Sequence, residues 1–184
     1  RTTPTNDTTP TWSWSPGGGG NGTYRYKLDS SDLTSGATET TSTSYTPGSA
    51  ISEASHTLYV QEQNAAGNWS SSGSRTIVID TTAPTAPSVS GTTPTNDTTP
   101  TWSWSSGGGG NGTYRYKLDS SDLTSGATQT TSTSYTPGSG ISEASHTLYV
   151  QERDAAGNWS SSGSRAIVIN TTAPTAPSVS GTTP

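Results

Sequence analysis

Each half of the chain carries one histidine next to a serine and near a glutamate, residue types that serve nucleophilic and general acid–base catalysis. These residues are Glu53, Ser55 and His56, with Glu143, Ser145 and His146 as their counterparts. Because neighbouring residues on a β-strand point to opposite faces, Ser55 and His56 cannot form a nucleophile–base pair. We interpret the histidines as solvated or turn-capping residues and predict that the chain is not an enzyme.

The carboxylates suggest a second chemistry, the binding of calcium, which takes about six to eight oxygen ligands from carboxylates and carbonyl groups. Asp80 and Asp154 are the first candidates, because each lies next to a loop that could add backbone carbonyls. Candidates at the opposite end of the first module are Asp7, Asp29, Asp32 and Glu53. Whether any of them converge depends on the fold of the segments that carry them.

Those segments occur twice. Residues 2–94 align with residues 92–184 at an offset of 90 without a gap, and only seven pairs differ. The differing pairs are Pro16/Ser106, Glu39/Gln129, Ala50/Gly140, Gln63/Arg153, Asn64/Asp154, Thr76/Ala166 and Asp80/Asn170. A period of 90 residues is too long for a helical solenoid and is typical of a chain of independent domains.

The stretch Thr-Thr-Ala-Pro-Thr-Ala-Pro at 81–87, repeated at 171–177, predicts a stiff linker, because proline fixes φ and removes a hydrogen-bond donor. It divides the chain into a first module at 1–80 without its first strand, a complete module at 81–170, and a linker with the first strand of a following module at 171–184. The expected partners are neighbouring repeats of the same protein. In an alternative, the spare strand fills the vacant edge of another chain, and head-to-tail self-association builds a filament.

The complete module predicts short antiparallel strands separated by glycine and proline turns. The strands are expected at 87–90, 101–105, 114–118, 128–135, 147–152 and 165–170. Alternation of aromatic and polar residues places Trp102, Trp104 and Tyr114 in the core. No segment repeats apolar residues at helical spacing over two turns, so we predict an all-β fold of antiparallel β-sandwiches with essentially no helix.

Composition excludes several classes of protein. Leu, Ile and Val number only 18 of 184 residues, but the six Trp and eight Tyr can build thin aromatic cores, because each buries about 150–250 Å². The absence of Cys excludes a disulfide framework and thiol chemistry. A net charge of -5 with only eight Lys and Arg argues against binding to nucleic acid. No apolar run approaches the roughly 18 residues of a membrane span, and Gly17–Gly20 lacks the Lys-Ser/Thr and the helix of a phosphate loop.

The succession Trp-Ser-Trp, Tyr-Arg-Tyr-Lys-Leu-Asp, Asp-Ala-Ala-Gly-Asn and Ile-Val-Ile-Asn-Thr-Thr-Ala-Pro resembles bacterial Ig-like tandem repeats of large surface adhesins. The resemblance covers each repeat from end to end, and Asp-Ala-Ala-Gly-Asn at 154–158 is its most specific piece. It implies tandem Ig-like β-sandwiches in an extracellular, cell-surface extender region between a membrane anchor and a ligand-binding tip. It also implies calcium at domain junctions.

In an Ig topology, Asp80 and Asp154 arrive at the end of the second module where its first strand enters, so they could converge there on calcium. Asn64 replaces Asp154 in the first module, and Asn170 replaces Asp80 at the end of the second. Each swap keeps a carbonyl ligand and removes a charge, so calcium affinity should be highest at the internal junction. The alternative is that these residues form turns through bonds to nearby backbone groups.

Three functions follow as expectations. Near-identity of the repeats favours a structural extender or a filament assembled by strand exchange, because a binding tip usually differs from its stalk. A carbohydrate-binding adhesive module needs exposed aromatic residues, and Trp69 and Trp159, which lie beside a loop, are expected to be partly exposed.

Overall fold

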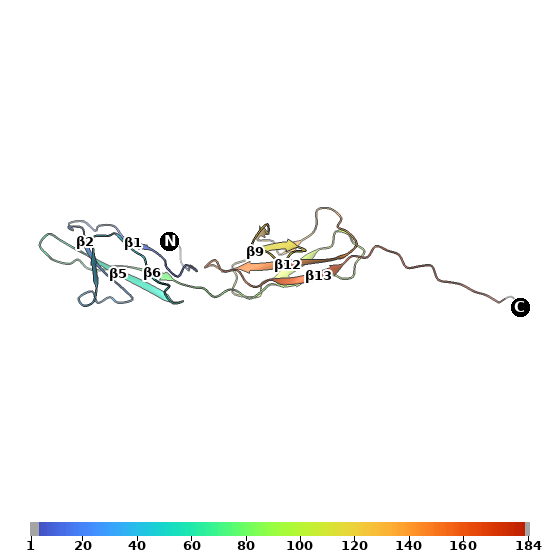
Figure 1. Ribbon diagram of the computed structural model, residues 1–184, viewed down its shortest axis with the longest axis horizontal. Coiled ribbons are helices and arrows are strands. Elements are labelled where there is room, and N and C mark those ends of the chain that lie inside the picture. The colour runs from blue at the N-terminus through green and yellow to red at the C-terminus, as the bar shows by residue number, and fades with distance from the viewer. Residues whose placement is uncertain (1–3, 183–184) are drawn as a thin grey trace. The chain divides into compact units, whose positions relative to one another are not determined.

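The computed structural model describes residues 4–182 and contains no helix among them, which confirms the predicted all-β class. The chain divides into two compact units (Figure 1). Unit 1 comprises residues 4–83 and the loop Asp154–Asn158, and unit 2 comprises Pro84–Arg153 and residues 159–182. A helix able to cross a membrane is likewise not found in the described part of the chain.

Unit 1 has six short strands in two antiparallel sheets. The strands are β1 (Trp12–Ser13), β2 (Thr23–Leu28), β3 (Thr38–Thr40), β4 (Ser44–Tyr45), β5 (Ser55–Gln63) and β6 (Gly73–Val78). One sheet has the order β3-β2-β5-β6, and the other consists of β1 and β4. Strand β5 pairs with both β2 and β6, and in the first of these pairings Thr23 lies opposite Gln63 and Leu28 opposite Leu58.

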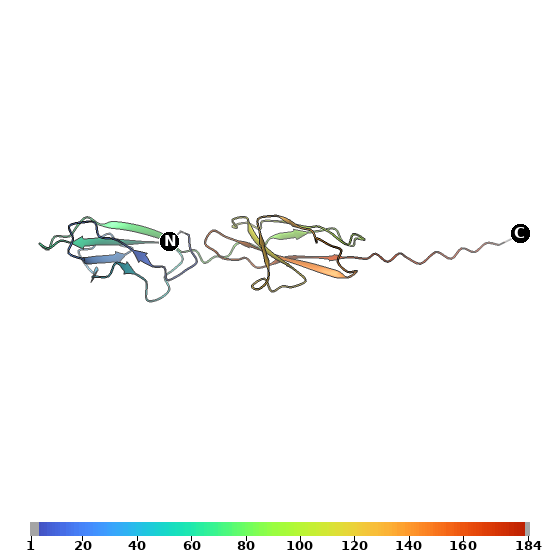
Figure 2. The ribbon, with the colours of Figure 1, turned by 90° about the horizontal axis from the view of Figure 1, so that it is seen from above.

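Unit 2 repeats this plan with one additional strand. Figure 2 shows the ribbon of both units from above. Its strands are β7 (Ser88–Ser90), β8 (Trp102–Ser105), β9 (Thr113–Leu118), β10 (Thr128–Thr130), β11 (Ser134–Tyr135), β12 (Ser145–Arg153) and β13 (Gly163–Val168). The sheets have the orders β10-β9-β12-β13 and β11-β8-β7. The two units are therefore tandem β-sandwiches, as the repeat and the strand pattern predict.

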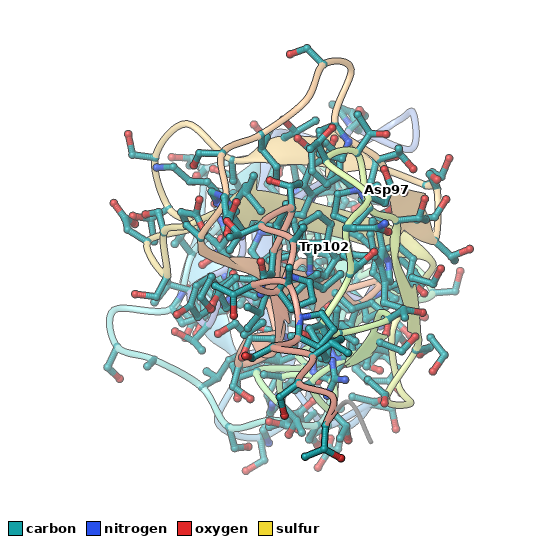
Figure 3. The ribbon with its side chains drawn as sticks, turned by 90° about the vertical axis from the view of Figure 1, so that its right-hand side faces the viewer. Asp97 and Trp102 are labelled. Atoms are coloured by element: carbon teal, nitrogen blue, oxygen red, sulfur yellow. The ribbon has the colours of Figure 1, made fainter. Side chains whose placement is uncertain are left out.

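Aromatic and aliphatic side chains fill the space between the sheets of each unit. Trp102, Leu148 and Ile167 are fully buried in unit 2, and Trp104 is 5% exposed. Figure 3 shows Trp102 among the side chains of the interior and Asp97 closer to the rim. The indole Nε1 of Trp102 donates a hydrogen bond to the Arg165 carbonyl at 2.9 Å. The alternation within 101–105 thus predicts correctly which side chains face the core.

The prediction of a single strand at 128–135 is wrong. The chain forms two strands there, because β10 pairs with β9 in one sheet whereas β11 pairs with β8 in the other. Between them, the Ser132 hydroxyl accepts a bond from the Ser134 amide at 3.3 Å, and the Thr130 hydroxyl accepts one from the Ser132 amide at 2.9 Å. These side-chain bonds replace the ladder and allow the bend between the sheets.

Candidate functional site

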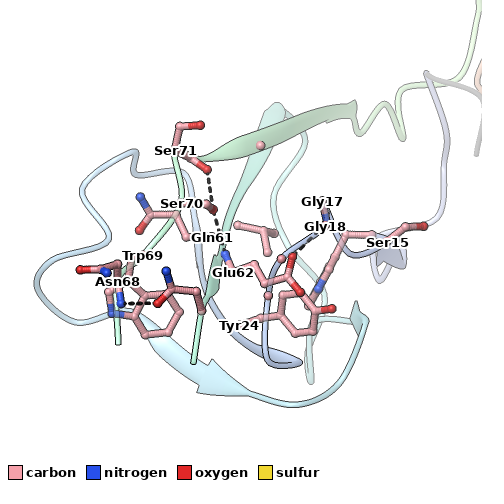
Figure 4. A pocket seen from close by; sticks show the side chains of 16 residues that line it. Ser15, Gly17, Gly18, Tyr24, Gln61, Glu62, Asn68, Trp69, Ser70 and Ser71 are labelled. Atoms are coloured by element: carbon pink, nitrogen blue, oxygen red, sulfur yellow. Dashed lines mark hydrogen bonds between the residues drawn. The ribbon is translucent and has the colours of Figure 1, made fainter. Parts of the chain in front are cut away.

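A cleft of about 650 Å³ opens in unit 1 beside the edge of β1, and we call it the unit 1 groove. Its lining includes Trp14, Gly17, Tyr24, Glu62, Trp69 and Gly73 (Figure 4). Trp14 follows β1, Tyr24 belongs to β2, and Glu62 lies near the end of β5, so both sheets contribute to the walls.

Glu62 organises the polar side of the unit 1 groove. Its Oε2 accepts a hydrogen bond from the Gly17 amide at 2.9 Å, which holds the glycine-rich loop against β5. Burial, and next the nearby Glu62 charge, raise the pKa of the Tyr24 hydroxyl above its usual value. Glu62 is the single carboxylate among the lining residues, which include no histidine, cysteine or lysine. The groove therefore offers aromatic surface and hydrogen-bonding groups, a chemistry suited to binding an extended chain.

The corresponding space in unit 2 is filled by the chain itself, in residues 84–90. β7 pairs with β8 so that Val89 lies opposite Trp104, and the Thr85 amide donates a bond to the Gly108 carbonyl at 3.0 Å. Val89 also packs against the core of unit 2.

Side chains around this space are more exposed in unit 1 than in unit 2. Glu152 and Val150 are 1% and 0% exposed, whereas their counterparts Glu62 and Val60 are only partly buried. Trp14 is likewise partly buried, although its counterpart is in the core. The unit 1 groove thus corresponds to the position that β7 covers in unit 2.

Trp69 and Trp159 are partly exposed, as expected from their positions beside a loop. An arginine covers one face of each ring. The Arg25 guanidinium lies 4.4 Å from the Trp69 ring centroid, and Arg115 lies 4.3 Å from that of Trp159. Arg25 Nε also donates a bond to the Gln61 side-chain oxygen at 2.7 Å, which fixes the guanidinium over the ring. A cation–π contact of this kind occupies the face on which a sugar would stack.

Each histidine forms a bridge that the sequence does not reveal. His56 Nδ1 lies 2.7 Å from the Asp29 carboxylate, and its Nε2 lies 2.9 Å from the Ser52 carbonyl oxygen and 3.4 Å from the Ser52 hydroxyl. His146, Asp119 and Ser142 repeat this arrangement in unit 2. Asp29 has a φ of 59°, a left-handed conformation that Asp tolerates better than most residues.

Ser52, His56 and Asp29 are the residue types of a catalytic triad. Their hydrogen bonds, however, indicate a histidine that is protonated on both ring nitrogens and links the two other residues. A carbonyl oxygen only accepts hydrogen bonds, so Nε2 of His56 must carry a proton when it bonds to Ser52. The bond to Asp29 is the main cause that raises the pKa of His56. The geometry therefore favours an imidazolium that donates from both nitrogens, whereas a general base needs a free Nε2 facing the hydroxyl. The expected turn-capping role fits this bridge, but the Asp29 partner was missed.

The calcium candidates expected at the opposite end of the first module are engaged in local hydrogen bonds. Glu53 lies at the Asp80 end instead, because its carboxylate bonds to Thr81 and Thr82. Asp7 Oδ1 accepts bonds from the Thr9 amide at 2.9 Å and from the Thr9 hydroxyl at 3.2 Å. Glu53 accepts bonds from the Thr81 and Thr82 hydroxyls at 2.6 and 2.7 Å, and these bonds lower the pKa of Glu53. Asp32 accepts bonds from Thr34, which lower its pKa.

Asp80 and Asp154 both belong to unit 1, where a side-chain amide bridges them. Asn158 Nδ2 donates to the Asp154 carboxylate at 2.8 Å and to the Asp80 carbonyl at 2.9 Å. Asp154 also accepts the Gly157 and Asn158 amides, and the Asp80 carboxylate accepts the Thr82 amide. Within the described residues, no three His, Cys, Asp or Glu side chains gather as metal ligands. Bonds from N–H groups fit turn formation better than a cation shell, and calcium binding stays a prediction.

Comparisons with known proteins give distant structural similarities. The chain is similar to fibronectin(III)-like modules of CbhA from Clostridium thermocellum, with 14% identity and a TM-score of 0.43, over 85% of this chain and 82% of that one. It is also similar to chicken CNTN1 domains FN1–FN3 (16%, 0.43, covering 82% and 55%) and to titin domains A168–A170 (14%, 0.44, covering 79% and 53%). No family model and no curated protein matches the chain. The β-sandwich fold is established by the two sheets in each unit.

Proposed function

We propose that the chain is a structural spacer, a pair of β-sandwich modules from the extender region of a bacterial cell-surface adhesin. The observation that carries this proposal is that one sequence of 90 residues, repeated, forms two separate cores that share several equivalent residues. Trp12, Leu58 and Ile77 are buried in one core, and their counterparts are buried in the other. A repeat that forms its hydrophobic core from its own residues can be added many times without changing its neighbours.

The exit from each module supports the same role. Glu53 bonds to Thr81 and Thr82 in unit 1, and Glu143 bonds to the Thr171 and Thr172 hydroxyls at 2.7 and 2.8 Å in unit 2. The Pro-rich sequence that follows favours an extended path. We infer that these glutamates limit the directions in which the linker leaves each module, which is useful in a spacer.

Small-angle X-ray scattering on proteins with two, four and six repeats tests this function. We expect the maximum dimension to increase by a constant length per repeat, and Glu53→Gln to increase the flexibility of the linker after that module. Glu39→Gln is the matched control, because Glu39 is exposed and the second repeat carries Gln129 there. A maximum dimension that does not grow with repeat number would contradict the spacer role.

Carbohydrate binding is the weaker alternative, because Arg25 and Arg115 cover one face of Trp69 and Trp159. A glycan array is expected to show no specific binding. Calcium binding is tested separately by isothermal titration calorimetry. The protein is first freed of metal ions with a chelator, and the chelator is then removed by dialysis. Heat of binding that Asp154→Asn abolishes would establish a site there, and a flat titration would remove calcium from the proposal.

A further inference from the structure

We propose that the outer face of the four-stranded sheet of unit 2 binds an acidic peptide segment through Arg115, Arg153 and Trp159. We call these three residues the unit 2 arginine cluster. The inference goes beyond the spacer function and does not depend on it. It predicts that two nearly identical repeats differ in what they bind.

The strand register places the cluster on one face of the sheet. Glu152 is buried, so its neighbours Gln151 and Arg153 on β12 point away from the core. Arg115 lies opposite Gln151 in the pairing of β9 with β12, and Trp159 forms an isolated antiparallel bridge with Arg153. The three residues of the cluster therefore share the outer face of the sheet.

Both guanidinium groups lie near the ring of Trp159. Their central carbons are 4.3 Å (Arg115) and 5.9 Å (Arg153) from the ring centroid. Arg115 Nε donates a hydrogen bond to the Gln151 side-chain oxygen at 2.7 Å, and the Gln151 side-chain nitrogen donates one to the Ser160 carbonyl at 2.6 Å. These bonds fix Arg115 through Nε, so its terminal N–H groups can serve a further partner.

The positive charges of the cluster are not neutralised locally. Among residues 4–182, neither guanidinium forms an ion pair with a carboxylate. The charge of Asp122 acts on Arg115, but the Asp122 carboxylate accepts the amide and the hydroxyl of Thr124 at 2.9 and 2.6 Å. Partial burial lowers the pKa of Arg115, and the charge of Asp122 opposes this effect. A partly desolvated guanidinium of this kind favours an added carboxylate.

Two of the differences between the repeats lie next to the cluster, and the first removes a negative charge. In unit 1, Glu39 of β3 lies directly opposite Arg25 of β2. In unit 2, Gln129 lies opposite Arg115. Directly opposite residues have Cβ atoms about 4.5–5.5 Å apart, so Glu39 lowers the positive potential at Arg25 and repels an incoming anion. Gln129 does neither.

The second difference adds a positive charge. Gln63 forms the bridge to Trp69 in unit 1, and Arg153 forms the bridge to Trp159 in unit 2. Asp154 also differs and is negative, but it is 5% exposed and accepts two backbone amides of its own loop. The outer face of unit 2 is thus more positive than that of unit 1 around the same arginine–tryptophan pair.

The available donors select the class of ligand. A guanidinium presents its N–H groups in a planar fork that matches the two oxygens of a carboxylate. Arg115 covers a face of Trp159 on which a sugar would stack, so an acidic polysaccharide would lose that contact. Glu and Asp side chains on an extended peptide are flexible enough to bring carboxylates to both arginines. Arg153 is exposed and Arg115 is partly exposed, so both can be reached from solvent.

Fluorescence anisotropy of a labelled hexaglutamate peptide, titrated with the full chain, measures this binding. We expect saturable binding of one peptide per chain that weakens as the salt concentration rises, because the contacts are ionic. Arg153→Gln should weaken binding by at least about tenfold, and Gln129→Glu should weaken it as well. Each variant gives unit 2 the residue that unit 1 carries at that position, so the fold accommodates it.

Arg165→Gln is the matched control, because it removes the same charge from the other face of the same sheet. Arg165 lies opposite Leu148, whose buried side chain faces the core. This variant should bind as the parent does. The double variant Glu39→Gln, Gln63→Arg should acquire a second site in unit 1 and bind two peptides per chain. Near-ultraviolet circular dichroism of each variant verifies that the tryptophan packing is intact.

Several outcomes would overturn the proposal. These are an absence of binding, equal affinity of the parent and Arg153→Gln, equal losses in Arg153→Gln and Arg165→Gln, and a double variant that binds no more peptide than the parent. Dextran sulfate is titrated in parallel as the other class of polyanion. Binding of dextran sulfate without binding of hexaglutamate would show that the site recognises a sulfated polysaccharide, and the assignment to an acidic peptide would be wrong.

Discussion

At the residue scale, the histidine bridges should make stability depend on pH. The Asp29 and Asp119 carboxylates raise the pKa of His56 and His146 in the folded state, so the folded protein holds these protons more tightly than the unfolded chain does. The resulting stabilisation is complete below the unfolded pKa of about 6.5 and is lost as pH rises through the raised folded pKa. We expect the free energy of unfolding, measured with urea, to fall over that range.

Asp29→Asn tests the bridge, because Asn tolerates the left-handed φ at this position but does not hold the imidazolium. The variant should lose about 1.5 kcal/mol at pH 6 and progressively less at higher pH. Glu39→Gln, at an exposed position without this bridge, serves as the control. A deficit that is the same at pH 6 and pH 9 would show that the imidazolium makes no contribution.

The two core tryptophans of unit 2 should respond differently to substitution by phenylalanine. Trp102 Nε1 donates to the Arg165 carbonyl, whereas Trp104 Nε1 is one of the buried polar atoms that find no partner in the described structure. Both variants lose ring contacts, but only Trp102→Phe leaves a carbonyl without its donor. We expect Trp102→Phe to lower the free energy of unfolding by about 1 kcal/mol more than Trp104→Phe. Equal losses in chemical denaturation would contradict the assigned role of the Nε1 bond.

Residue types and alternation predict the core but not the polar bridges. Trp102 and Leu148 alternate with polar residues, so period-two spacing is sufficient to place them inside. The bond between Asp29 and His56 joins residues 27 positions apart in the sequence. Because its formation depends on the β2–β5 register and on a left-handed φ at Asp29, local sequence carries little sign of it. An Asp at the end of the alternating Tyr-Arg-Tyr-Lys-Leu run is the one signal that was present.

At the element scale, alanine substitutions at Gly163 and at its counterpart Gly73 should change the stability of the two units differently. Gly163→Ala places a methyl group against the Pro87 carbonyl and should destabilise unit 2 by about 1–3 kcal/mol, in the range of overpacked cores. Gly73→Ala meets open space and should be neutral or stabilise unit 1 by about 0.5 kcal/mol, because alanine restricts the unfolded chain. Thermal unfolding of the chain measures both. Similar destabilisation by both substitutions would contradict the open space found at Gly73.

Strand positions were predictable where they depend on alternation, and less so where they depend on side-chain bonds to the backbone. β8, β9 and β12 lie within a few residues of the expected segments, because aromatic and aliphatic residues mark their inward faces. The expected strand at 128–135 contains only Thr, Ser, Gln and one Tyr, so apolar periodicity could not reveal that it divides. The division follows from Ser132, whose hydroxyl bonds to the backbone of Ser134.

At the scale of the whole molecule, the two cores should unfold as separate cooperative units. Leu58 and Leu148 occupy equivalent positions, are 2% and 0% exposed, and belong to different core clusters. Replacement of a buried leucine by alanine typically removes about 3 kcal/mol. Leu58→Ala should therefore lower the unfolding temperature of one transition and leave the other in place, and Leu148→Ala should do the reverse. Differential scanning calorimetry of the chain resolves the two, and one shared transition that both variants shift equally would mean that the repeats fold as a single body.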